Sequence, residues 1–446
     1  MRATLCLVLS VSFACGGKNT GADVDSAPPP DACVGVECNI VDCAAMSLPP
    51  TRITGTVFAP NGTLPLNGVS VYVPRDPLPA FVEGATCDRC VTTLPGSPVV
   101  QTVSDAAGNF QLDNVPIGDF SLVVTTGKWR REVPVIGVAQ CTTTAVAAAQ
   151  TRLPKDRSEG SIPKIAITTG GADTLECLVR KLGVESSEIG KTGDDRRIHL
   201  YSGNGTSSFA AGFAGGSGAI PSATPFWGTV DSLKVYDIVI LSCEGAQNPG
   251  TKQQSALNAM KAYADLGGRV FASHWHNMWI GGNFEDNNAT LAPAVWNTIG
   301  TWGNNADFNG TASIDEVSNP KGTAFANWML NVMGTATPAV RGEFPITEGR
   351  QTSLTIEPSR AERWVTRKGQ TNPQMFQFTT PNEAEPDARC GKVVFTDMHV
   401  SGAPADPVPA YPDNCIGGAN NLTLTPQEKA LAFMFFDIAS CVGGLF

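Results

Sequence analysis

The sequence predicts an α/β protein in which a small β-sandwich precedes a doubly wound, mostly parallel sheet with large inserts. Residues 51–152 hold short alternating or β-branched runs separated by Gly- and Asn-containing turns, which is typical of a sandwich. Residues 162–442 alternate short apolar runs with amphipathic helical segments, the pattern of buried parallel strands and crossover helices. A polar linker, 153–161, separates the two. The 446 residues include 46 glycines and 32 prolines, so we expect long surface loops between these elements.

The amino-terminal segment indicates export. Residues 5–13 form an apolar run too short to span a membrane, as in a signal peptide, which we place at residues 1–15. The end of this segment, Val-Ser-Phe-Ala-Cys-Gly, resembles a bacterial lipobox, and the resemblance implies lipidation of Cys15 and sorting to the outer membrane. Residues 16–50 contain Pro, Gly, Ser and Cys and are predicted to be a disordered tether. Ordinary signal cleavage near the same position is the alternative.

The charge of the chain argues against nucleic acid as a partner. The formal net charge is −10 at pH 7, and the sequence contains no cluster of Lys and Arg of the kind that neutralises phosphates. The expected partners are instead the membrane, through the lipid anchor, and carbohydrate, for reasons given below.

The first domain is predicted to contain five short strands. They cover residues 53–58, 69–73, 99–103, 109–112 and 120–124. The stretch 104–122, with Gly and aromatic residues at fixed offsets, resembles the carboxypeptidase regulatory-like, transthyretin-like domain family. This resemblance implies a spacer or binding module without catalytic machinery. Asp105 within the stretch is expected to cap a turn, with calcium binding as the alternative.

The second domain is predicted from a repeated strand-helix order. Strands are expected at 164–169, 198–202, 236–242, 269–273 and 392–396, and helices at 172–184, at 252–266 and beyond Thr425. Thr425 and Glu428 form a capping box with Pro426 in the first turn, so the last helix begins there. The glycines after the first of these strands do not form a GxGxxG pattern, which argues against a dinucleotide site.

Three segments of this domain resemble the class I glutamine amidotransferase-like superfamily, most closely its trehalose-utilisation-protein-like (ThuA-like) branch. They are Tyr-Asp-Ile-Val-Ile-Leu at 236–241, Gly-Gly-Arg-Val-Phe-Ala-Ser-His at 267–274, and Gly-Lys-Val-Val-Phe-Thr-Asp-Met-His at 391–399. The resemblance implies a sharp elbow after the second segment, where amidotransferases carry a nucleophilic cysteine, and a catalytic histidine at His399. The elbow of this chain holds His274 instead of cysteine, which argues against glutamine hydrolysis.

Polar side chains follow three of the expected strands, as Cys243-Glu244, His274-Trp275-His276 and Asp397-Met398-His399. The carboxyl ends of parallel strands meet at one edge of a sheet, where ligands bind, so we expect these side chains to share one pocket. Its expected members are His274, His276, Asp397 and His399, bordered by Glu244 and by Trp275 or Trp279. Residues two apart on a strand share a face, so the three histidines are candidate ligands for zinc or another divalent metal. A metal-free polar pocket and a purely structural role are the alternatives.

Cysteine usage is consistent with export, since 13 cysteines in a chain of this size allow several disulfides. Cys87 and Cys90 form a CxxC in a Pro- and Gly-rich loop and are predicted to be a loop staple, because the second pair that a zinc ribbon needs is missing. Cys177 lies in the helix after the first strand of the second domain and is predicted to pair with Cys243. The alternative is that Cys243 attacks a bound carbonyl group, with His399 as its base.

Tryptophan is concentrated near the same strand ends. Six of the 8 tryptophans lie between residues 220 and 330, in segments rich in Gly and Asn. Aromatic faces beside amide side chains suit sugar rings, so Trp275 and Trp279 are candidate sugar platforms and Asp397 is a candidate partner for sugar hydroxyls. Core packing is the alternative, and it is favoured for Trp328, which falls in a helical pattern.

Two classes of function remain open. One is a cell-envelope binding protein, for carbohydrate among other ligands, whose amidotransferase-like site has lost its chemistry. The other is a hydrolase or sugar-modifying enzyme that uses His399 with His274, His276 and Glu244, with a divalent metal or without one. The missing nucleophile at the elbow favours the first class, and the clustering of ionisable side chains favours the second. The sequence does not decide whether the protein is an enzyme.

Overall fold

The structure is a computed structural model that describes residues 33–90, 94–284, 293–303, 306–335, 338–399 and 405–443. The expected signal peptide, the lipidation site Cys15 and residues 16–32 of the expected tether lie outside these ranges. The expectation of disorder is wrong for residues 33–50, because they form two short helices, η1 (Val36–Asn39) and η2 (Ala44–Met46), and the Cys43–Cys141 disulfide ties them to the sandwich. No helix within the described ranges is long and apolar enough to cross a membrane.

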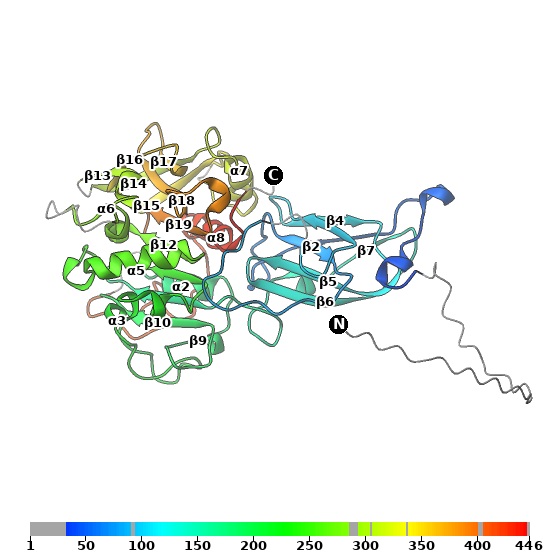
Figure 1. The fold of residues 1–446 in the computed structure, drawn as a ribbon, viewed down its shortest axis with the longest axis horizontal. Helices are drawn as coiled ribbons and strands as arrows, with labels where there is room; N and C mark the ends of the chain where they lie inside the picture. Colours follow the sequence, from blue (N-terminus) through cyan, green and yellow to red (C-terminus); the bar gives the residue numbers. More distant parts are fainter. Residues whose placement is uncertain are drawn as a thin grey trace, which may run out of the picture.

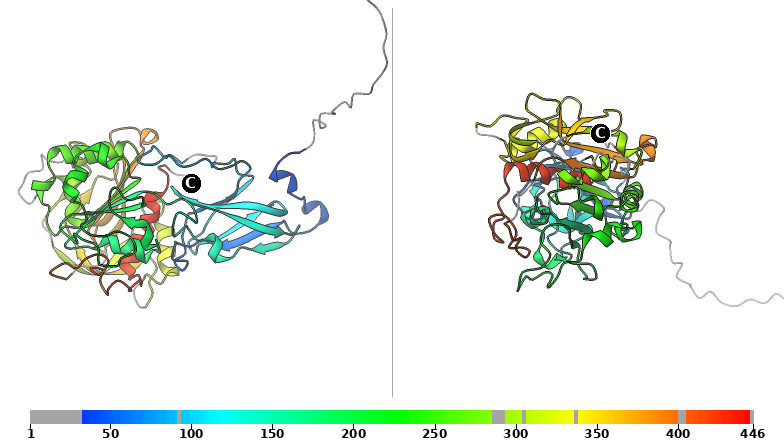
Figure 2. Two further views of the ribbon diagram at one scale, coloured as in Figure 1. Left: turned by 90° about the horizontal axis from the view of Figure 1, so that it is seen from below. Right: turned by 90° about the vertical axis from the view of Figure 1, so that its left-hand side faces the viewer.

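The first domain is a sandwich of two sheets at one end of an elongated molecule (Figures 1 and 2). One sheet has the order β4-β1-β7 and the other β3-β2-β5-β6. The strands are β1 (Arg52–Thr56), β2 (Ser70–Val73), β3 (Val100–Val103), β4 (Asn109–Asp113), β5 (Gly118–Thr126), β6 (Trp129–Val138) and β7 (Thr143–Ala145). The last two are additional to the five expected. Asp105 caps a turn as expected, since its Oδ1 accepts hydrogen bonds of 2.8 Å from the backbone N–H groups of Ala107 and Asn109.

The second domain is built on a ten-stranded sheet, and the protein is of the α/β class as predicted. The strand order is β15-β14-β17-β18-β19-β12-β11-β8-β10-β9. The run from β19 to β9 is parallel throughout, and the remaining four strands add to it in antiparallel fashion. The parallel strands are β8 (Ile165–Thr169), β9 (Ile189–Gly190), β10 (Ile198–Ser202), β11 (Ile238–Leu241), β12 (Arg269–Ser273) and β19 (Gly391–Thr396). The antiparallel strands are β14 (Asp307–Ile314), β15 (Glu343–Arg350), β17 (Glu362–Arg367) and β18 (Pro373–Thr380), and β13 (Gly300–Trp302) pairs with β16 (Ser353–Ile356) apart from the sheet.

Both faces of the parallel strands are buried, which explains their continuous apolar runs. Ile240 and Phe271 belong to the hydrophobic cluster that includes helices α2 and α8, whereas Val239 and Ala272, which alternate with them, belong to the cluster that includes α5. The helices are α2 (Leu175–Lys181), α3 (Ala223–Trp227), α4 (Val230–Leu233), α5 (Gln254–Asp265), α6 (Met278–Gly281), α7 (Gly322–Asn331) and α8 (Pro426–Ala439), and α1 (Ala148–Thr151) ends the sandwich. The expected capping box of Thr425 is present at the start of α8.

After β8, the chain adds β9 and β10 on one side of β8 and then β11 and β12 on its other side. The gap between β8 and β11 is therefore a topological switch point, where ligands of doubly wound folds bind. In this protein, the backbone of the loops after β8, β10 and β11 fills the space at that switch point. A Cβ atom on Gly170 would lie 2.1 Å from the carbonyl oxygen of Cys243, and one on Gly205 would lie 2.5 Å from the carbonyl oxygen of Gly170. Three loops therefore pack together closely at the end of β8, and the candidate site lies instead at the ends of β11, β12 and β19.

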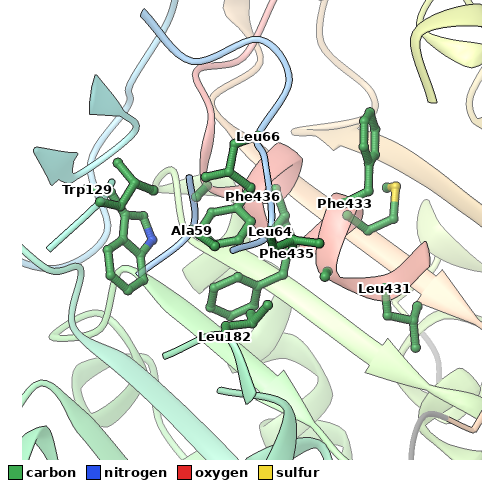
Figure 3. Close-up of a cluster of buried hydrophobic side chains, with 14 of the residues drawn as sticks. Ala59, Leu64, Leu66, Trp129, Leu182, Leu431, Phe433, Phe435 and Phe436 are labelled. Carbon is green, nitrogen blue, oxygen red and sulfur yellow. The ribbon is translucent and has the colours of Figure 1, made fainter. Parts of the chain in front are cut away.

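The two domains share one hydrophobic core. Leu64, Leu66 and Trp129 of the sandwich pack in the same cluster as Phe435 and Phe436 of α8 (Figure 3). The ring centroid of Trp129 lies 6.4 Å from that of Phe435 and 6.1 Å from that of Phe436. The sandwich thus covers apolar surface of the α/β domain as part of a continuous core.

A segment that we call the strap, residues 74–90, crosses from the sandwich to the α/β domain. The N–H of Ala85 donates to the carbonyl of Lys234, and the N–H of Cys90 donates to the carbonyl of Val442. Disulfides fix the strap, Cys87 to Cys390 and Cys90 to Cys441. The expected Cys87–Cys90 staple is therefore wrong, because each of the two cysteines docks against a different part of the second domain.

The expected Cys177–Cys243 disulfide is also wrong. Cys177 is bonded to Cys415, on the long loop before α8, and Cys243 is the free cysteine of the described residues. The physical reason is that the two cysteine side chains point toward different parts of the domain. Cys177 lies on α2, which this loop covers, whereas the sulfur of Cys243 faces the elbow after β12.

Candidate functional site

Three side chains from neighbouring strand ends meet in a cluster that we call the Cys-His-His cluster. It consists of Cys243, two residues after β11, His274, the first residue after β12, and His399, three residues after β19. One donor atom from each residue lies within 4.8 Å of the others. The His274 Nδ1 is 3.3 Å from the Cys243 Sγ and 3.2 Å from the His399 Nε2. All three side chains are buried, with relative exposures of 0%, 1% and 3%.

The parallel register explains why these residues meet. Leu241 of β11 lies beside Ala272 of β12, and Ser273 lies beside Thr396 of β19, so the three strands end at nearly the same level. The chain then turns sharply at His274, whose φ of 43° is in the left-handed region, and enters the short helix η5 (His274–Asn277). Histidine is among the residues that tolerate this conformation, and the elbow directs its ring toward the neighbouring strand ends.

His276 does not join the cluster. Because β12 ends at Ser273 and a helix follows, residues 274 and 276 do not share a face as they would on a strand. The Nδ1 of His276 accepts a 2.9 Å hydrogen bond from the indole N–H of Trp279, and its Nε2 lies 2.8 Å from the carbonyl oxygen of Ser242, to which it donates. Burial lowers the pKa of His276 to about 4. Both nitrogens are occupied within the protein, so this neutral ring is not available to a metal.

Asp397 also points elsewhere. Its carboxylate accepts hydrogen bonds from the backbone N–H groups of Thr352 and Ser353, at 2.9 and 2.8 Å, and from the Thr352 hydroxyl at 2.6 Å. Burial raises the pKa of Asp397 to about 6. Asp397 thus anchors the turn before β16, and the structure does not bring it together with the histidines as the alternation along the strand had predicted.

The expected border residues are buried in contacts of their own. Glu244 forms an ion pair with the buried Lys252 and accepts a 3.2 Å hydrogen bond from Asn248. The Trp275 ring lies beside that of His274 in a tilted arrangement, with 4.7 Å between ring centroids, and Trp279 packs against Trp227 at 5.5 Å. Neither tryptophan is more than 7% exposed, so neither offers an open face to a sugar ring. Trp328 is buried in α7 against Phe433, in agreement with the packing interpretation.

Burial favours the neutral forms of two cluster side chains, Cys243 and His399. Burial raises the pKa of the Cys243 thiol to about 12. Burial and the charge of Arg350 lower the pKa of His399 to about 3. A thiolate–imidazolium pair is therefore not stabilised, and a neutral thiol is a poor nucleophile. One sulfur and two imidazole nitrogens are donors that zinc and other transition metals accept, and binding such an ion would release the thiol proton of Cys243.

Sequence reasoning missed two buried acids next to the cluster. Asp173, in the loop between β8 and α2, accepts a 2.8 Å hydrogen bond from the hydroxyl of Ser273, and Glu176, on α2, lies 3.4 Å from the hydroxyl of Ser242. Burial raises the pKa of Glu176 to about 8. No pattern in the sequence marked these acids, because they approach the site from a different strand end.

Comparisons with known proteins do not identify the chain. No family model matches it, and no curated protein matches it. Among solved structures, a cytoplasmic protein from Salmonella typhimurium is 12% identical with a TM-score of 0.32, over 62% of this chain and 99% of that one. A cohesin–X-dockerin complex from Acetivibrio cellulolyticus is 13% identical with a TM-score of 0.16, over 36% of this chain and 78% of that one. Similarity at this level supports no argument about function.

Proposed function

We propose that this protein binds a transition-metal ion, zinc foremost, at the Cys-His-His cluster, and that it does so in the cell envelope as a lipid-anchored protein. The observation that carries the proposal is the convergence of three metal-donor atoms, from three neighbouring strand ends, within 4.8 Å of one another. In the terms of the amidotransferase resemblance, His274 takes the place of the lost nucleophile, and the former catalytic position becomes a metal site.

The distances within the cluster are compatible with a tetrahedral metal ion. With Zn–S of about 2.3 Å and Zn–N of about 2.0 to 2.1 Å, a tetrahedral ion holds its sulfur and nitrogen donors about 3.5 Å apart and two nitrogen donors about 3.3 Å apart. The corresponding separations in the protein are 3.3 Å for Cys243 to His274 and 3.2 Å for His274 to His399. These two separations lie within a few tenths of an ångström of the tetrahedral values, and the third pair, Cys243 and His399, lies within 4.8 Å.

The redox state of Cys243 gives independent support. The described residues contain five disulfides, as expected for an exported protein, and Cys243 stands outside them. This buried thiol lies beside two imidazoles, in a chain whose other described cysteines are oxidised. Coordination of the sulfur to a metal ion is consistent with its staying outside the disulfides.

The experiment is a metal analysis of the mature protein after equilibration with zinc and removal of excess ion. We expect about one zinc per chain, and we expect Cys243→Ser and His399→Ala to lose it. The matched control is His199→Gln, which changes a buried histidine outside the cluster. Zinc no higher than in a chelated sample, or unchanged zinc in both cluster variants, would overturn the proposal.

A second candidate function follows from the number of ligands. Three protein ligands leave the fourth position of a tetrahedral zinc open, and this is the arrangement of catalytic rather than structural zinc sites. A hydrolase or sugar-modifying enzyme therefore stays the alternative to a binding protein. Cobalt substitution separates the two, because water at the open position can be displaced by small anions such as azide, with a change in the visible spectrum, whereas a closed site does not respond.

A further inference from the structure

The two cluster residues that follow β11 and β12 are each preceded by a serine that contacts a buried acid. Ser242 precedes Cys243 and its hydroxyl lies 3.4 Å from the Oε2 of Glu176, whereas Ser273 precedes His274 and its hydroxyl donates to the Oδ2 of Asp173 at 2.8 Å. The second bond has normal hydrogen-bond length for a carboxylate acceptor, and the first is long. The contact of Ser273 with Asp173 is therefore the firmer of the two serine–acid contacts.

The path of Asp173 across the sheet is unusual. It belongs to the loop that follows β8, and its partner Ser273 ends β12, although β11 lies between these two strands. The carboxylate thus reaches over the end of β11, where the N–H of Ala172 also donates to the carbonyl of Cys243 at 3.0 Å. One short loop therefore contacts the residue next to His274 and the backbone of Cys243 together.

We infer that Asp173 is a positioning residue of the metal site, which it serves by holding Ser273 and hence the elbow that presents His274 to Cys243 and His399. This inference rests on the proposed metal-binding function. Asp173 is not itself a ligand in it, since its Oδ2 is engaged by Ser273 and its Oδ1 accepts the N–H of Thr174 at 2.9 Å.

The physical reason lies in the backbone of the elbow. A residue other than glycine with positive φ costs free energy and persists only where its surroundings hold it. His274 has a φ of 43°, and the residue immediately before it is pinned by a buried carboxylate that is itself 0% exposed. Without that bond, the elbow is free to relax, and the His274 Nδ1 loses its position between the sulfur of Cys243 and the ring of His399. Groups that orient metal ligands in this way commonly contribute about 10- to 100-fold to metal affinity.

The test is a cobalt titration of the mature protein, followed by the thiolate-to-cobalt charge-transfer band, which reports the Cys243 ligand directly. We expect Ser273→Ala to weaken cobalt binding by about 10- to 100-fold. Ser242→Ala is the matched control, since it removes a buried serine hydroxyl one residue before another ligand but breaks only the 3.4 Å contact. It is expected to change the affinity by less than about threefold, in keeping with the weakness of a long contact. Asp173→Asn provides a second variant that keeps the side-chain shape, should Ser273→Ala fail to fold.

The outcomes separate the positioning role from a merely structural one. Melting temperatures of the metal-free proteins are measured in parallel, because a structural role lowers the stability of both serine variants without selectively weakening metal binding. Wild-type affinity in Ser273→Ala, or in Asp173→Asn if the first variant does not fold, overturns the inference and leaves the metal site intact. A wild-type protein that shows no cobalt band overturns the proposed function and the inference with it.

Discussion

Removing the Cys90–Cys441 disulfide tests how firmly the strap joins the two domains. When Cys90 and Cys441 are both replaced by serine, the Cys87–Cys390 disulfide still ties the strap to the start of β19. The newly opened loop comprises residues 87–90 and 390–441, 56 residues in all, for which the chain-entropy relation gives a loss of about 4 kcal/mol in the free energy of unfolding. The strap also exchanges two backbone hydrogen bonds with Val442, from the Cys90 N–H to the Val442 carbonyl and from the Val442 N–H to the Asp88 carbonyl, and the variant keeps both.

The assay is urea-induced unfolding of the mature protein without reductant, followed by circular dichroism. The matched control replaces Cys33 and Cys38 by serine, since that disulfide has a sequence separation of only 5. The same relation gives about 2 kcal/mol for it, half the loss expected for the strap variant. Equal losses in the two variants would refute the loop argument. Two separate unfolding transitions in the wild type would refute the view that the sandwich and the α/β domain share one core.

The other predictions concern the core, the pH dependence and the site. Trp129→Ala should lower the free energy of unfolding by about 3 to 5 kcal/mol in the same urea assay, because the indole is fully buried between the domains. Burial lowers the pKa of His199 to about 4, so the unfolded chain binds a proton near pH 6.5 that the folded chain refuses, and stability falls as the pH falls between these values. Between pH 7 and pH 4 the wild type should lose about 3 kcal/mol more than His199→Gln in urea titrations, and equal losses would contradict this assignment. Without reductant, iodoacetamide should label Cys243 only after unfolding, as read from peptide masses; labelling of the native protein would show that the thiol is accessible. Gly170→Ala should reduce the zinc content, because its Cβ would lie 2.1 Å from the Cys243 carbonyl oxygen, whereas Gly250→Ala, with open space around it, should not.

Much of the fold could be predicted because its signals are local. The apolar runs at 164–169 and 392–396 are buried strands, and Thr425 starts a helix, since hydrophobic period and capping chemistry act over a few residues. The contact between His274 and His399 could also be predicted, because neighbouring parallel strands bring their carboxyl ends to one edge of the sheet.

The composition of the cluster could not be predicted in the same way. Whether His276 follows His274 toward the site depends on where β12 stops, and the left-handed turn at His274 is held by contacts with distant loops. The sequence separation between Cys177 and Cys243 does not show which way the two side chains point, so a disulfide between them was predicted although the structure has none. The neighbours of Cys243 in the structure, His274 and His399, lie 31 and 156 positions further along the chain. No sequence pattern operates over such separations.

The two strap disulfides have a consequence for the resistance of the chain to proteolysis. Because Cys87 and Cys90 reach to Cys390 and Cys441, the polypeptide from the strap to the last helix forms covalently closed rings. A protease that cuts once anywhere between residues 94 and 389 leaves the two fragments attached through at least two bridges, and a cut between 391 and 440 leaves them attached through at least one. A nick in a surface loop therefore does not shed the domain that carries the Cys-His-His cluster, and damage of this kind becomes visible on a gel only after reduction.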